Sequence, residues 1–371
     1  MYTLENFAKD MKEYMECENS ECDYKNEFTL YQAIKNKNIN YCKTLLRLYE
    51  VKYIDYIIND DTYTCLMLAS SYDYSEIVKL LVDAHAKLDI KNIHGNSALM
   101  LASRRGHIET LKILIDAGAN LDLVDKCGNT ALWTVFPNAI KILVNAKARL
   151  DISNNTCETA LIWASKTGQK EVTKLLIDAG ARLDIHNSNT ALMLASQAGQ
   201  IEIVEILVDA GAKLDIQNAI AGDTALMLAS RAGRIEILKI LINAGAKLNI
   251  QNDDGDTALM LASQNGRIEI LKILVDARAN LDIINKYGNT ALWSSYYRAI
   301  LILVDARANI DIINYTGDTA LSLASHNGHI NIVNILVDAG AKADAIDETK
   351  KLDIDDAENI LPKPRCCCEI Q

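Results

Sequence analysis

A seven-residue phrase, TALMLAS or a close variant, recurs along the chain at intervals of about 33 residues. Its copies begin at Thr64, Ser97, Thr130, Thr159, Thr190, Thr224, Thr257, Thr290 and Thr319, and a decayed copy begins at Phe28. Such a period is typical of a repeat array, in which a unit too small to bury its own apolar face stacks on its neighbours. The sequence therefore predicts one elongated array of ten units over 28–345, instead of the two or three globular domains that 371 residues would suggest.

Each unit contains two apolar segments with helical periodicity. In the unit that begins at Thr190, ALMLAS predicts a short first helix, and IEIVEILVDAG predicts a second helix with a wide apolar face. Gly211 follows the second helix, where a left-handed C-cap is expected. In four other units this glycine is replaced by His85, Lys147, Arg278 and Arg307. A left-handed conformation at these residues would cost about 1 kcal/mol each.

An aspartate recurs in the phrase LDI that follows the second helix. Its copies are Asp89, Asp122, Asp151, Asp184 and Asp215. Aspartate side chains often accept hydrogen bonds from turn backbone, so we expect these residues to stabilise the nearby turns.

The repeated units resemble the ankyrin repeat, whose pattern is roughly DxxGxTPLHxAxxxGHxEIVxxLLxxGAxxN. The likeness is clearest in GNSALMLASRRGHIETLKILIDAGANLD (95–122) and GDTALSLASHNGHINIVNILVDAGAKAD (317–344). The Pro of TPLH is Ala in the copies from Ser97 onward and Cys65 in the copy at Thr64, and its His is Met, Trp, Ile or Ser. The resemblance implies an all-α solenoid of about ten helix-turn-helix units joined by extended hairpin-like turns. It also implies a concave surface that binds a partner protein.

Two units are four residues shorter than the others, which is about one helical turn. They read TALWTVFPNAIKILV and TALWSSYYRAILILV, with Trp133 and Trp293 at matching positions. Two interpretations remain open: the aromatic rings fill the space of the missing turn, or they are exposed anchors on the binding side. KCGNTALW recurs as KYGNTALW 160 residues later, which indicates duplication of a five-repeat block.

The resemblance places partner-binding residues on the turn tips and on the solvent side of each first helix. The candidates are Asn96, Arg104, Arg105, Asn129, Trp133, Glu158, Asp223, Arg231, Asp254, Asp256, Tyr287, Trp293 and Asp318. The later tips are acidic, which favours a basic patch on the partner protein.

Composition and motifs argue against other functions. A formal net charge of −11 disfavours nucleic-acid binding, because that affinity comes mainly from Lys and Arg. The sequence contains no GxGxxG, P-loop, GxSxG or HExxH motif, and His326 and His329 have no third ligand beside them. Six of the nine cysteines are scattered without a CxxC pair. We therefore expect a monomer that is not an enzyme and binds no metal or cofactor.

The two ends are expected to differ from the array. Residues 1–27 predict a helical N-terminal cap, and 346–361 predict a C-terminal capping helix. The first residues lack a basic segment followed by an apolar core, and no apolar run approaches the ~18 residues that a membrane span needs. We therefore expect a cytoplasmic protein with reduced thiols.

The last ten residues, 362–371, predict a flexible tail that carries a lipidation motif. CEIQ fits the C-a-a-X prenylation pattern, with Cys368 as the acceptor and Gln in the farnesyl-favouring group. One lipid chain binds membranes weakly, and Cys366 and Cys367 are palmitoylation candidates for a second. The sequence thus predicts an interaction scaffold tethered to the cytosolic face of a membrane.

Alternatives of other classes remain. The chain could be a soluble adaptor or inhibitor without an anchor, or a regulatory subunit of an enzyme complex. The Ile-, Asn- and Lys-rich repeats are similar in composition to ankyrin families of large amoeba-infecting DNA viruses or intracellular microbes.

Overall fold

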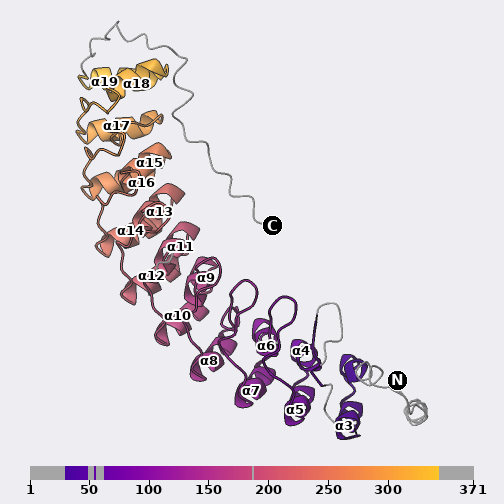
Figure 1. The fold of residues 1–371 in the computed structure, drawn as a ribbon. Helices are drawn as coiled ribbons and strands as arrows, with labels where there is room; N and C mark the ends of the chain where they lie inside the picture. Colours follow the sequence, from indigo (N-terminus) through magenta and orange to yellow (C-terminus); the bar gives the residue numbers. More distant parts are fainter. Residues whose placement is uncertain (1–29, 49–53, 56–61, 186–187, 342–371) are drawn as a thin grey trace, which may run out of the picture.

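A computed structural model of the protein describes residues 30–48, 54–55, 62–185 and 188–341. Every regular element in these ranges is helical, and the helices form two rows in a curved stack (Figure 1). The predicted all-α solenoid is therefore confirmed. The predicted cap 1–27, the capping helix 346–361 and the tail 362–371 with Cys366, Cys367 and Cys368 lie outside the described residues.

One row lies on the concave side of the stack, and we call it the inner row (Figure 1). After a helical stretch over residues 30–35, it consists of α4 (Cys65–Ser71), α6 (Ala98–Arg105), α9 (Ala160–Lys166), α11 (Ala191–Ala198), α13 (Ala225–Ala232), α15 (Ala258–Gln264) and α18 (Ala320–His326). The outer row lies on the convex side. It consists of α3 (Ile39–Leu48), α5 (Ser75–Asp83), α7 (Ile108–Asp116), α8 (Pro137–Asn145), α10 (Lys170–Asp178), α12 (Ile201–Asp209), α14 (Ile235–Asn243), α16 (Ile268–Asp276), α17 (Tyr297–Asp305) and α19 (Ile330–Asp338). Each of the ten predicted units supplies one outer helix.

The repeated Thr of TALMLAS begins the inner helices. In α11, the hydroxyl of Thr190 accepts a hydrogen bond from the backbone N–H of Met193 at 3.2 Å, which satisfies one of the free donors of the first turn. The same cap begins the other inner helices from α4 to α18, with Ser97 in place of Thr in α6. The threonine hydroxyl thus defines the helix start where the family pattern continues with proline.

Burial follows the apolar pattern of the sequence. Most residues of the inner helices from α4 to α15 are buried; in α11 this holds for every residue from Ala191 to Ser196. The last inner helix, α18, buries only Ala320, Leu321 and Ala324. Outer helices bury one stripe, such as Ile203, Val204 and Leu207 of α12. The core is consequently a continuous layer between the two rows, and it depends on contact between successive units.

The outer helices end in left-handed residues, as predicted. Gly211 has φ 85°, and the four residues that replace glycine also have positive φ. Their φ values are 63° at His85, 69° at Lys147, 64° at Arg278 and 66° at Arg307. These four residues therefore adopt the left-handed conformation that glycine adopts in the other units, although their side chains make it less favourable.

The recurring aspartate of LDI differs from its prediction in its partner. Oδ1 of Asp215 accepts a hydrogen bond at 2.9 Å from the backbone N–H of Lys247, which lies 32 residues later in the next unit. The equivalent bond is made by Asp55, Asp89, Asp122, Asp151 and Asp184. We predicted bonds to nearby turn backbone; the turn that donates belongs to the next unit, so these carboxylates connect successive units.

The two short units depart further from the prediction. Each lacks its inner helix altogether, and a turn leads from Thr130 to α8 and from Thr290 to α17. We predicted a first helix in every unit, with about one turn missing from these two, and that prediction is wrong. A four-residue deletion leaves too few residues for a hydrogen-bonded helix between the cap and the start of the outer helix.

Hydroxyl groups replace part of the lost helix. The Ser103 hydroxyl, from the preceding inner helix, donates to the carbonyl of Ala131 at 2.6 Å, and Thr134 donates to the carbonyl of Ser103 at 2.9 Å. The second short unit repeats this exchange with Ser263, Ala291 and Ser294. The buried backbone thus keeps partners where the helix is missing.

Candidate functional site

The inner row and the turns that precede it form one surface, which we call the inner face. Each of these turns ends in a fingertip, defined here as the residues from the turn Asn or Asp to the residue before the repeated Thr or Ser, for example 252–256. In that fingertip, Oδ1 of Asn252 accepts from the backbone N–H groups of Asp254 and Asp256 at 3.1 and 2.8 Å. Gly255 has φ 77°, and a side chain there would meet the next fingertip, because its Cβ would lie 2.7 Å from the backbone nitrogen of Lys286. The fingertips are therefore internally bonded and closely stacked.

Side-chain amides join the fingertips in series, and we call this series the amide ladder. At five places the residue before the repeated Thr accepts the side-chain amide of the next unit's turn Asn. The pairs are Asn154 to Asn129 at 3.0 Å, Asn218 to Asn189 at 2.9 Å, Asn252 to Asp223 at 2.8 Å, Asn285 to Asp256 at 2.8 Å and Asn314 to Asn289 at 3.2 Å. Of the predicted binding residues, Asn129, Asp223 and Asp256 thus take part in contacts between units.

The same position also accepts a hydrogen bond from the end of its own inner helix, eight residues later. Arg104 donates to Asn96 at 2.6 Å, Lys166 to Glu158 at 2.9 Å, Arg231 to Asp223 at 2.7 Å and Gln264 to Asp256 at 3.4 Å. Asp223 is only 1% exposed and Asp256 only 9%. Both carboxylates are therefore enclosed by the array and offer a partner little charge.

Two other predicted residues are also engaged within the array. Arg104 reaches Asp125 of the next fingertip at 2.6 Å, and Arg105 donates to the backbone carbonyl of Ser71 in the preceding unit. Burial by itself raises the pKa of Asp125, but hydrogen bonds from Arg104 and from the backbone of Asn129 outweigh it, so the net pKa is lowered.

Of the four aspartates behind the predicted acidic trend of the later tips, two remain accessible. Asp254 is exposed and pairs with Lys286 of the next fingertip. Asp318 is half-buried and accepts from the Thr316 hydroxyl at 2.7 Å. Of the four predicted tip aspartates, these two can therefore attract a basic partner, and the exposed Asp253 beside Asp254 adds to them.

Exposed aromatic side chains lie at the C-terminal end of the inner face. Tyr287 is 56% exposed and Tyr315 is 71% exposed. They occupy consecutive fingertips, which are joined by a hydrogen bond from the backbone N–H of Tyr315 to the carbonyl of Tyr287 at 3.1 Å. The ammonium of Lys286 lies 5.3 Å from the centre of the Tyr287 ring. Large aromatic side chains that are exposed to solvent on hydrogen-bonded turns are typical of protein-binding sites.

The two tryptophans of the short units have different surroundings. Trp133 is 9% exposed and packs against Trp163 of the next unit, with ring centres 5.5 Å apart. Trp293 is half-buried. The space-filling interpretation thus fits Trp133, whereas Trp293 retains access to solvent. We did not single out Trp163 from the sequence, although comparison of the two blocks at their 160-residue offset would have marked it.

Other aromatic residues of the short units cover glycines of the preceding unit. Phe136 lies over Gly106, where an added Cβ would come within 2.6 Å of the ring, and Tyr296 lies over Gly266 in the same way, at 2.7 Å. These rings stand at the start of α8 and α17, and each lies beside the turn between the two helices of the preceding unit.

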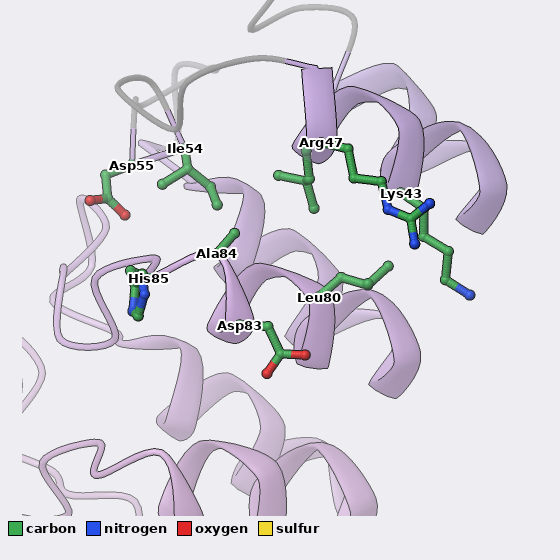
Figure 2. Close-up of a pocket in the computed structure, with 9 residues that line it drawn as sticks. Lys43, Arg47, Ile54, Asp55, Leu80, Asp83, Ala84 and His85 are labelled. Atoms are coloured by element: carbon green, nitrogen blue, oxygen red, sulfur yellow. The ribbon is translucent and has the colours of Figure 1, made fainter.

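A cleft of about 530 Å³ lies between α3 and α5 and is lined by several titratable residues (Figure 2). Lys43 and Arg47 lie on one side, and Asp55 and His85 lie on the other. Lys43 is paired with Glu76 at 2.8 Å, and Asp55 accepts from the backbone of Lys87 at 2.7 Å. No hydrogen bond joins the titratable groups of the cleft to one another within the described ranges. The cleft therefore presents no assembled acid–base or nucleophilic pair.

Two other kinds of feature, a metal-binding cluster and a membrane span, are absent from the part of the chain that the structure describes. No group of three His, Cys, Asp or Glu residues there could hold a metal ion. In the same ranges, no helix has the length and apolar character that crossing a bilayer requires.

Comparison with known proteins bears on the whole array. A family model for ankyrin repeats (3 copies) matches residues 3–92, 134–218 and 214–285, which is more than half of the chain. A model for a single ankyrin repeat matches 94–126 and 316–348. No curated protein matches the sequence. Among solved structures, the human ASB11 ankyrin repeat domain aligns with a TM-score of 0.51 and 23% identity, over 58% of this chain and 99% of that one. At that identity the likeness supports the fold alone.

Proposed function

The chain belongs to the ankyrin repeat family, and we propose that it is a non-enzymatic scaffold that binds a partner protein on its inner face. The observation that carries the proposal is the pair of exposed tyrosines, Tyr287 and Tyr315, on consecutive fingertips. Tyrosine provides a large contact area with few rotatable bonds and is enriched at binding hot spots.

The rigidity of the inner face supports this role. Asx turns, the amide ladder and the bonds from the inner helices hold the fingertips before any partner arrives. A surface that is already ordered loses little conformational entropy on binding, which leaves more of the contact energy for affinity. The partner we propose is a folded or extended protein segment that covers the tyrosines.

Affinity capture with a matched pair of variants tests this function. The wild-type chain and a Tyr287→Ala/Tyr315→Ala variant are each used to capture proteins from cells, and the captured proteins are identified by mass spectrometry. Leu301→Ala is the control, because Leu301 is an exposed apolar residue on the outer helix α17. We expect the partner to be retained by wild type and Leu301→Ala and to be weakened at least about tenfold by the double variant. Equal capture by all three would rule out the fingertip surface.

We also propose that lipids tether the scaffold to the cytosolic face of a membrane. The support is the sequence CEIQ, with Cys368 as the prenyl acceptor and with Cys366 and Cys367 beside it for palmitoylation. The likeness in composition to repeat families of large amoeba-infecting viruses would place that membrane in a host cell. The competing function is a soluble adaptor, inhibitor or regulatory subunit with no anchor.

Expression in eukaryotic cells of a protein that ends at Gln371 separates these functions. Intact mass should show a prenyl group on wild type and none on Cys368→Ser, and only wild type should float with membranes. Cys366→Ser with Cys367→Ser should keep the prenyl group but bind membranes more weakly, because one chain is a marginal anchor. An unmodified wild-type protein that stays in the soluble fraction would favour the soluble adaptor.

A further inference from the structure

The two missing inner helices leave two gaps in the inner row, one between α6 and α9 and one between α15 and α18 (Figure 1). The gaps are built by the duplicated five-repeat blocks, so each residue of one has a counterpart 160 positions away in the other. They can therefore be compared as two versions of the same site within one molecule.

The first gap is filled by the chain itself. Trp163 of α9 occupies it, tilted by 39° against Trp133, and Trp133 is buried as a result. The second gap is not filled. Its counterpart of Trp163 is Leu323 of α18, and a pocket of about 250 Å³ lies there, lined by Trp293, Leu323, Ala324 and Ile332 among others. The change from an indole to an isobutyl group is the largest difference between the two sites.

The pocket has room for an aromatic ring. An apolar cavity of roughly 150 Å³ in another protein holds benzene, and this pocket is larger. Trp293, Leu323 and Ile332 give it apolar walls that suit an offset or tilted ring contact, and Ser294, Ser295 and Asn327 add polar groups to the lining. The first gap demonstrates the fit, because an indole occupies the equivalent position there.

The rim carries a polar group without its usual partner. His107 begins the outer helix α7, and its Nδ1 lies 2.9 Å from the carbonyl of Ser70 at the end of the preceding inner helix. His329 holds the same position at the start of α19 and lines the pocket. The unit before it has no inner helix, and the His329 imidazole makes no hydrogen bond within the described residues. It is available to a carbonyl from outside the chain.

We propose that this pocket binds the side chain of a partner tryptophan, with Trp293 as one wall and His329 bonded to a carbonyl of the partner's backbone. The site deepens the proposed function and rests on it for the identity of the ligand as part of a protein. Its lining comes from the two units that directly follow the Tyr287 and Tyr315 fingertips, so one partner segment could cover all three features.

The probe is N-acetyl-tryptophanamide, which carries both an indole and amide carbonyls. It is titrated against the full chain, with saturation-transfer NMR to detect binding and methyl spectra to report on Leu323 and Ile332. We expect wild type to bind it in the millimolar range, with shifts at those two methyl groups. Absence of binding to wild type would overturn the proposal.

Exchange of the two equivalent residues supplies the decisive comparison. The indole of Leu323→Trp should fill the pocket and weaken binding of the probe roughly tenfold or more. Leu301→Trp, on the outer face, should leave binding of the probe unchanged. Trp163→Leu should open a second site beside Trp133 and double the number of probe molecules bound. Helical circular dichroism of each variant verifies that the array is folded. Leu323→Trp that binds like wild type, or folded Trp163→Leu without a second site, would overturn the proposal.

Other occupants of the pocket give distinct results. If the probe binds only after residues 342–371 are deleted, the chain's own C-terminal segment is the occupant. If sedimentation shows a dimer that Leu323→Trp dissociates, a second copy is the occupant. Either result overturns the proposal. If the Leu323→Trp variant still retains a captured partner, the scaffold function stands and the pocket proposal is overturned. If the probe binds but no partner is captured, the pocket stands and the scaffold function is contradicted.

Discussion

Asn252 donates its side-chain amide to Oδ1 of Asp223 across 2.8 Å, and the two residues belong to successive units of the array. The same carboxylate accepts from Arg231 of its own inner helix at 2.7 Å. Asp223 thus binds the end of its own inner helix and the turn of the neighbouring unit at once. Apolar stacking tolerates small slips between units, whereas this set of bonds allows one register only.

Removal of the Asp223 carboxylate should destabilise the centre of the array. Asp223→Ala leaves the buried Asn252 amide without its acceptor and Arg231 without its partner, so we expect the free energy of unfolding to fall by about 2–4 kcal/mol. Asp254→Ala is the control, since Asp254 is exposed, and it should change stability by less than about 0.5 kcal/mol. Urea unfolding combined with hydrogen exchange of α13 and α15 measures both. Equal effects from the two variants would contradict a structural role for the ladder.

Glycine should stabilise the left-handed caps that lack it. Arg278 and Arg307 have φ 64° and 66°, so Arg278→Gly and Arg307→Gly should each raise stability by about 0.5–1 kcal/mol through relief of strain. The reverse change, Gly245→Arg, should lower stability by about 1 kcal/mol, because Gly245 has φ 92° and open space around its Cα. Thermal unfolding gives the three differences. Unchanged melting temperatures for both arginine variants would show that these turns are not strained.

The contribution of Asp125 should disappear in acid. Burial raises its pKa, and hydrogen bonds from Arg104 and the backbone more than compensate, so the folded pKa lies below the unfolded value of about 3.9. A lowered folded pKa means that the stabilisation is complete above the unfolded pKa and is lost as pH falls through the folded one. The stability advantage of wild type over Asp125→Asn should therefore be constant from about pH 7 to 5 and shrink below about pH 4. Arg104→Ala should remove most of this pH dependence; an advantage that does not vary with pH would refute the assignment.

The sequence predicted what repeats in every unit and missed what depends on neighbours. The helix pairs were predicted from the apolar periodicity, and the left-handed caps were predicted from Gly211 and its counterparts. Both signals lie within a few residues of the feature that they predict. The bond from Asp215 to Lys247 connects residues 32 positions apart, so the turn alone gave no sign of it. Loss of the inner helix in the first short unit had one visible signal. Pro137 favours the first position of a helix, and α8 begins there, directly after the cap sequence.

The last prediction concerns the serine of TALMLAS, because three buried copies of this serine make different hydrogen bonds. Ser103 donates to the carbonyl of Ala131 in the helix-free unit, Ser230 donates to Leu226 of its own helix at 2.7 Å, and the buried Ser196 hydroxyl has no partner in the described structure. Ser103→Ala leaves the buried carbonyl of Ala131 without its hydrogen-bond donor and should lower the free energy of unfolding by about 1–3 kcal/mol. Ser230→Ala should lower it by less than about 0.5 kcal/mol, since that carbonyl already belongs to the helix ladder. Ser196→Ala should be neutral or stabilising, because it removes a hydroxyl buried without a bond. Urea unfolding of the three variants gives the order directly. If Ser103→Ala were no worse than Ser196→Ala, the hydroxyl would not be what replaces the missing helix.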